Sequence, residues 1–83
     1  MERTEAFANR LADEVGLAIK AAGISQRELA SKTGIPLVTL SRRLAATGRG
    51  FTMAELLLVT DAVGADLPEL ITRAEAATPR EIA

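Results

Sequence analysis

A three-residue stretch, Gly34-Ile35-Pro36, restricts the fold of this chain more than any other feature. Glycine ends a helix well because it accepts the left-handed backbone conformation that helix ends often need. Proline has its φ angle already set for a helix start, and it lacks the N–H that a helix start leaves unpaired. The stretch therefore predicts two helices joined by a tight turn, with Ile35 pointing into the core.

The residues on both sides of this turn have helical patterns. Ser25 and Glu28 form a capping-box pair at the start of the first helix, where Leu29 supplies an apolar side. Leu40 and Leu44, four residues apart, form the inner face of the second helix. Each flank is thus predicted to be a short amphipathic helix.

Two short helices joined in this way are typical of a helix-turn-helix, which we predict for residues 25–46. In that motif the second helix, here residues 36–46, enters the major groove of DNA. The run Ser25–Arg42 resembles the Cro and phage-repressor (XRE) family in the pattern S-Q-x-E-L-A-x-x-x-G-I-x-x-x-T-L-S-R, and looser similarity extends over about Val15–Ile71. The resemblance implies an all-α, five-helix, lambda-repressor-like fold that binds DNA.

Apolar spacing predicts the remaining helices of a single domain spanning residues 1–83. They are Glu5–Ala22, Met53–Val63 and a last helix from Leu67 to about Ala76, followed by a loose tail over 78–83. Two sets of side chains are expected to face the core from the two longer helices: Phe7, Leu11, Val15, Ala18 and Ala22, with Ile19 beside them, and Met53, Leu56, Val59, Thr60 and Val63.

Capping patterns mark two of these helix starts. Thr52 with Glu55, and Asp66 with Glu69, repeat the spacing seen at the start of the helix-turn-helix. Pro68 in the first turn fits the second of them, because proline is favoured there.

The resemblance also implies one departure inside the core. Many relatives carry an Arg at the position of Ile19 and a Glu at the position of Leu44, and these two side chains pair. Packed apolar residues can replace a buried ion pair with little loss of stability. We therefore expect Ile19 and Leu44 to touch.

Charge is distributed unevenly along the chain. The net charge is −1, which argues against a protein that coats nucleic acid without specificity. The segment from Lys20 to Gly50, however, holds six basic residues and one acidic residue, so its net charge is +5 and that of the remainder is −6. Because the cationic segment coincides with the helix-turn-helix, it indicates a DNA-facing side.

The residue types that the chain lacks exclude several kinds of catalytic and metal-binding chemistry. The chain has no Cys and no His, so thiolate chemistry and the commonest general acid–base are absent, and no metal-ligand pattern is evident. We expect the protein not to be an enzyme and to bind no cofactor or small-molecule ligand. No apolar run approaches the ~20 residues that a membrane span needs, and no secretory signal is visible, which predicts a cytoplasmic protein without membrane contact. Eight Arg against two Lys weakly favour a GC-rich bacterial or phage genome.

The motif and the resemblance together predict the DNA-binding residues: Gln26, Arg27, Lys32, Pro36, Leu37, Val38, Thr39, Ser41, Arg42, Arg43 and Arg49. In the family, the glutamine at the position of Gln26 sits beside a phosphate and braces the second helix. Arg42 could read guanine bidentately, or it could contact a phosphate.

Other members of this set have two readings each. Leu37 and Val38 replace the polar residues usual in relatives, so they would contact thymine methyl groups or a protein partner. Arg43 would be half-buried or reach the DNA backbone. Arg49 lies between two glycines in a predicted loop and would contact a phosphate or remain solvated.

Three functions remain open from the sequence. The first is a transcription regulator, Cro-like or repressor-like, that binds a double-stranded operator. The second is an antitoxin that represses its own operator and needs its acidic ends to neutralise a toxin. The third is a protein-interaction module that kept the fold without DNA binding. Leu57, Leu58 and the helix from Leu67 are candidate surfaces for a weak homodimer, with a monomer as the alternative.

Overall fold

The computed structural model describes residues 2–79, which form five α-helices and no strand. The helices are α1 (Arg3–Ala21), α2 (Gln26–Thr33), α3 (Leu37–Leu44), α4 (Met53–Val63) and α5 (Leu67–Ala77). The predicted all-α class and the number of helices are confirmed over this range.

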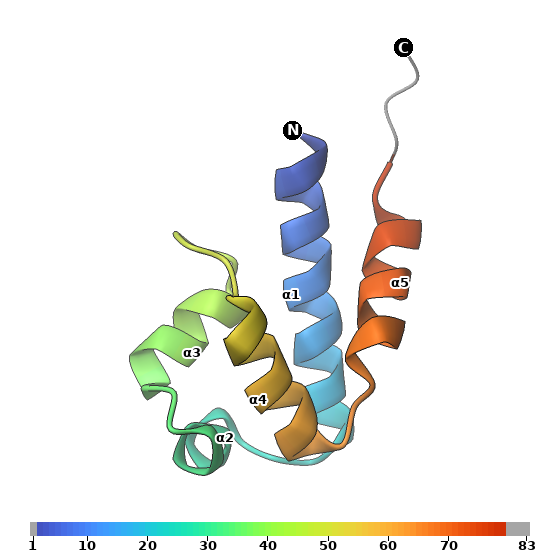
Figure 1. Ribbon diagram of the computed structural model, residues 1–83. Coiled ribbons are helices and arrows are strands. Elements are labelled where there is room, and N and C mark those ends of the chain that lie inside the picture. Colours follow the sequence, from blue (N-terminus) through green and yellow to red (C-terminus); the bar gives the residue numbers. More distant parts are fainter. Residues whose placement is uncertain (1, 80–83) are drawn as a thin grey trace.

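Helix α1 runs through the middle of the molecule, and the other helices pack around it (Figure 1). Its most extensive contact is with α5, which runs antiparallel beside it. Helices α3 and α4 also contact α1, whereas α2 packs mainly against α3 and α4. The α2–α3 pair therefore lies on the side of α1 opposite to α5 (Figure 1).

One apolar core joins all five helices. Val15, Leu29, Leu40 and Val59 are completely buried at its centre. The remaining large buried side chains of this core come from every helix except α2 and α3, and from the turn between those two: Leu11, Ile19, Ile35, Leu56, Leu67 and Leu70. The hydroxyl of buried Thr60 donates to the carbonyl of Leu56 at 2.8 Å, so the core holds no unpaired hydroxyl at this position.

Two core predictions were wrong, and a third is not tested. Ala22 is exposed because α1 ends at Ala21, whereas Ala12, which was not expected in the core, is buried. Met53 is 61% exposed, because it is the first residue of α4 and its side chain lies beyond the edge of the core. Ile19 and Leu44 both belong to the same core, as the expected pairing requires, and their direct contact stays a prediction.

The turn between α2 and α3 forms where the glycine was expected to place it. Gly34 ends α2 in the left-handed conformation, with φ 78°. The hydroxyl of Thr33 donates to the carbonyl of Leu29 at 2.9 Å and accepts from the N–H of Ile35 at 3.2 Å. Pro36 precedes α3 as its N-cap residue, so the helix begins one residue later than predicted.

The helix starts differ in how they are capped. Ser25 accepts a hydrogen bond from the N–H of Glu28, and Thr52 and Glu55 form a complete capping box. Asp66 makes no side-chain capping bond, so that prediction was wrong. Its expected partner on the first turn of α5, Glu69, instead binds Arg73 one turn further on.

The C-terminal ends of α3 and α5 also differ from the prediction. Helix α3 ends at Leu44, two residues early, because Ala46 adopts a left-handed conformation with φ 58°. Thr78, predicted to start a loose tail, is buried and donates its hydroxyl to the carbonyl of Ala74 at 2.7 Å. Residues 80–83 of the predicted tail lie outside the described residues.

Ala46→Gly should stabilise the protein by about 0.5–1 kcal/mol, since a left-handed residue with a Cβ is strained by about 1–2 kcal/mol and glycine gives back part of this as unfolded-chain entropy. Ala45→Gly is the matched control, because Ala45 has φ −78° and gains no relief. Urea unfolding should therefore show a gain for Ala46→Gly and a loss for Ala45→Gly. An equal loss in both variants would contradict this account.

Candidate nucleic-acid interface

A side-chain hydrogen bond joins the first residue of α2 to the middle of α3. The hydroxyl of Ser41 donates to Oε1 of Gln26 at 2.8 Å, across fifteen residues of sequence. Both residues belong to the predicted binding set, and the structure brings them together. The bond fixes the exposed side of α3 relative to the N-terminus of α2, where free backbone N–H groups and the helix dipole favour an anion.

The outer face of α3 carries one exposed cation, and the first turn of the helix carries apolar side chains that differ in exposure. Arg42 is exposed, and its side chain makes no hydrogen bond or ion pair with any residue from 2 to 79. In the first turn, Leu37 is half-buried, whereas Val38 is 63% exposed. Thr39 is half-buried beside them. The face therefore offers a guanidinium and a branched apolar side chain one turn apart.

Further cations surround this face. Arg27 and Lys32 lie exposed on α2, and Arg49 lies exposed in the connection between α3 and α4. Nζ of Lys32 is 3.9 Å from Oε2 of Glu28, one turn away on the same helix. Exposed ion pairs of this kind are weak. Helices α2 and α3 and the connection that follows them occupy the same side of the molecule (Figure 1). The cationic segment thus forms one side of the fold.

Arg43 points inward, unlike the other predicted binding residues. Only 14% of its side chain is exposed, and its Nε donates to Oε1 of Glu55 at 3.0 Å. Its Nη1 also donates to the carbonyl of Arg49 at 3.0 Å. Of the two readings in the sequence, the structure gives the half-buried one. The charge of Arg43 is neutralised by Glu55, so it adds little to the cationic surface.

Glu55 is the acceptor at the centre of this arrangement. The N–H of Thr52 donates to the same Oε1 atom at 2.9 Å. This backbone hydrogen bond, together with the hydrogen bond and charge of Arg43, lowers the pKa of Glu55 against the opposing effect of burial. Sequence reasoning found the capping box but missed the ion pair, because nothing in the spacing of Arg43 and Glu55 indicates that α3 and α4 meet there.

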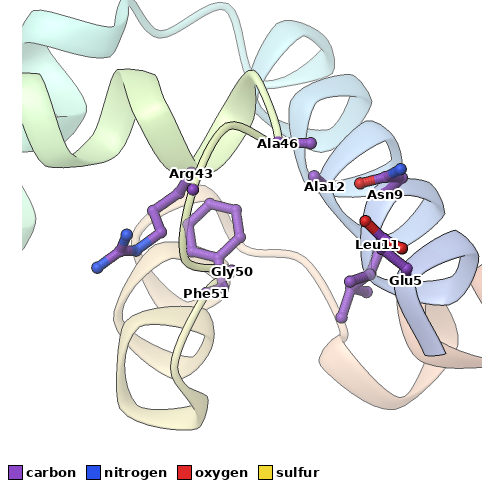
Figure 2. A pocket seen from close by; sticks show the side chains of 10 residues that line it. Glu5, Asn9, Leu11, Ala12, Arg43, Ala46, Gly50 and Phe51 are labelled. Carbon is purple, nitrogen blue, oxygen red and sulfur yellow. The ribbon is translucent and has the colours of Figure 1, made fainter.

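A shallow pocket of about 150 Å³ separates α1 from the connection between α3 and α4 (Figure 2). Asn9 and Ala12 of α1 line one side, and Gly50 and Phe51 line the other. Phe51 packs against the core at the end of the connection. The glycine-containing part of the connection therefore stands away from α1.

Residues 2–79 contain no group of three or more His, Cys, Asp or Glu side chains placed to hold a metal ion. Within the same range, no helix is long and apolar enough to cross a lipid bilayer. Leu57 and Leu58, the candidate dimer surface on α4, are about half exposed.

Comparisons of the sequence with protein-family models, with curated proteins and with solved structures gave no significant match.

Glu55→Gln should weaken the dependence of stability on pH. Because the pKa of Glu55 is lower in the folded than in the unfolded chain, its ionised form stabilises the fold at pH values above the unfolded pKa. That contribution is lost as pH falls through the folded pKa. The wild type should therefore lose more stability than Glu55→Gln in the acid range, and the variant should be about 1 kcal/mol less stable at neutral pH.

Urea unfolding at a series of pH values measures this difference. Asp61→Asn is the control, since Asp61 is exposed on the same helix and its side chain makes no hydrogen bond or ion pair within the described range. The same pH dependence in wild type and Glu55→Gln would show that Glu55 is not the group responsible.

Proposed function

We propose that this protein is a sequence-specific regulator of transcription that binds double-stranded DNA, in the manner of the Cro and phage-repressor family that its sequence resembles. In this proposal α2 and α3 form the helix-turn-helix of a lambda-repressor-like domain. Helix α3 lies in the major groove, and the N-terminus of α2 lies against the DNA backbone.

The observation that carries the proposal is the hydrogen bond between Gln26 and Ser41. A helix that reads base edges must be held at a fixed angle to the groups that contact phosphates, since those contacts set its register on the duplex. The bond supplies such a link, because it joins the anion-favouring end of α2 to the exposed side of α3. Its two residues stand where the family pattern has glutamine and serine.

The distribution of charge supports the same function. Four exposed cations, Arg27, Lys32, Arg42 and Arg49, lie on the side formed by α2, α3 and the connection after them. Cations in such a position release counterions from DNA and supply most of the affinity that does not depend on sequence. Arg42 adds a planar fork that matches the O6 and N7 atoms of guanine.

One observation favours a second function. Val38 is 63% exposed at a position where a DNA-reading helix usually carries a polar residue. A protein partner would cover it, as would the methyl group of a thymine. A protein-interaction module with the same fold is therefore the competing proposal.

A gel shift with the DNA upstream of its own gene distinguishes the two. The regulator should shift a short segment of that DNA at concentrations that leave unrelated DNA of equal length free. No shift at low salt, where the electrostatic contribution is largest, would reject DNA binding and leave the interaction module.

Arg42→Ala should weaken binding to the specific segment by about 1–3 kcal/mol and change binding to random DNA little. The reason is that guanine recognition is lost, whereas the remaining cations still attract phosphates. Arg27→Ala is the matched control and should weaken both kinds of DNA alike. The melting temperature should barely move, because Arg42 is exposed and the core around Leu40 is untouched. An equal loss on both DNAs would make Arg42 a phosphate contact instead.

Arg49→Ala should weaken all DNA sequences alike and flatten the dependence on salt. Each phosphate neutralised contributes roughly −0.9 to the slope of log affinity against log salt concentration. Removing one backbone contact should thus reduce the slope by about one unit, measured between 50 and 200 mM salt. An unchanged slope would remove Arg49 from the backbone contacts.

A further inference from the structure

Arg43 connects three parts of the chain: α3, α4 and the connection between them. It stands in the last turn of α3, its Nε binds Glu55 of α4, and its Nη1 binds the carbonyl of Arg49 between them. Glu55 in turn accepts from the N–H of Thr52. We call this arrangement, formed by Arg43, Glu55, the Arg49 carbonyl and the Thr52 N–H, the loop clamp.

The part that the clamp holds has little other support. Arg49 lies between Gly48, with φ 73°, and Gly50, and glycine-flanked backbone loses much conformational entropy when it is ordered. The pocket of about 150 Å³ on the α1 side means that this stretch has no close packing there (Figure 2). At its start, Thr47 binds the carbonyl of Arg42 through its N–H at 3.1 Å and through its hydroxyl at 3.3 Å. Among the described residues, the hydrogen bond from Arg43 to the Arg49 carbonyl is what holds the backbone between Thr47 and Phe51.

The clamp leaves the side chain of Arg49 available. Arg49 is exposed, and its guanidinium makes no hydrogen bond or ion pair with any of the described residues. The backbone of Arg49 is held by the Arg43 guanidinium, whose charge is already neutralised by Glu55. The result is a fixed backbone carrying a free cation, which is what a preorganised phosphate contact requires.

We propose that Arg43 is a positioning residue, which acts on DNA through Arg49 by holding the loop rather than by touching the duplex. The proposal depends on the proposed function for its ligand, and it assigns to Arg43 a role different from that of the exposed cations. An arginine is needed for it, because the planar guanidinium donates in two directions at once, to Glu55 and to the carbonyl of Arg49. A lysine keeps the charge but lacks this fork.

A double-mutant cycle with Arg43→Lys and Arg49→Ala tests the role in DNA binding. In the wild-type background, Arg49→Ala should reduce the salt slope by about one unit. In the Arg43→Lys background, the same substitution should change the slope and the affinity by much less, because Arg49 is already misplaced. Arg27→Ala is the control and should cause the same loss in both backgrounds, since Arg27 makes no hydrogen bond or ion pair with the clamp. Equal effects of Arg49→Ala in both backgrounds would overturn the proposal.

A measurement without DNA separates this proposal from the proposed function. Backbone order parameters from NMR relaxation should be high for Gly48, Arg49 and Gly50 in the wild type and should fall in Arg43→Lys and in Arg43→Met. Those of α1 and α2 should stay unchanged. Unchanged order in the loop would overturn the clamp even if DNA binds. A wild type that binds no DNA would reject the proposed function, and the order parameters would then decide the clamp alone.

Discussion

Complete burial of Leu40 is the constraint on which the exposed side of α3 depends. Helix α3 has eight residues, and a helix of this length is not stable alone in water. Its one completely buried side chain is Leu40, which joins a core supplied mostly by α1, α4 and α5. Because Leu40 is held in the core, it determines which residues of α3 face solvent. Two polar links then fix the rotation of the helix: Ser41 to Gln26 near its middle, and Arg43 to Glu55 near its end.

Local patterns predicted much of this fold because they act over three or four residues. The glycine at position 34, the capping box at Thr52 and the full extent of α4 follow from backbone and hydrogen-bond preferences that need no partner from elsewhere. Predictions failed where the structure depended on distant contacts or on helix ends. Met53 fits the apolar stripe of α4, yet it is 61% exposed. Ala46 fits a continued helix, yet the chain leaves α3 two residues earlier.

In the candidate site, too, local patterns predicted some features, whereas a feature that depends on a distant contact was not predicted. Exposure of Arg27 and Arg42 could be expected from their places outside the apolar stripes, and that of Arg49 from its place in a predicted loop. The inward direction of Arg43 could not, because it depends on the meeting of α3 with α4. Ile19 and Leu44 are apolar members of the core, and an ion pair with little exposure stands between α3 and α4. The charge pairing therefore supports the connection after α3 rather than the base of the helix.

The hydrogen bond between Gln26 and Ser41 has a mechanical consequence. Helix α2, helix α3 and this bond form the three sides of a triangle, whose remaining corner is the turn at residues 34–36. The turn alone would leave the angle between the two helices adjustable; the packing of Leu29 and Leu40 in one core and this hydrogen bond together restrict that angle. A force applied to either helix is consequently transmitted to the other, and a ligand that grips the N-terminus of α2 also steadies the outer face of α3.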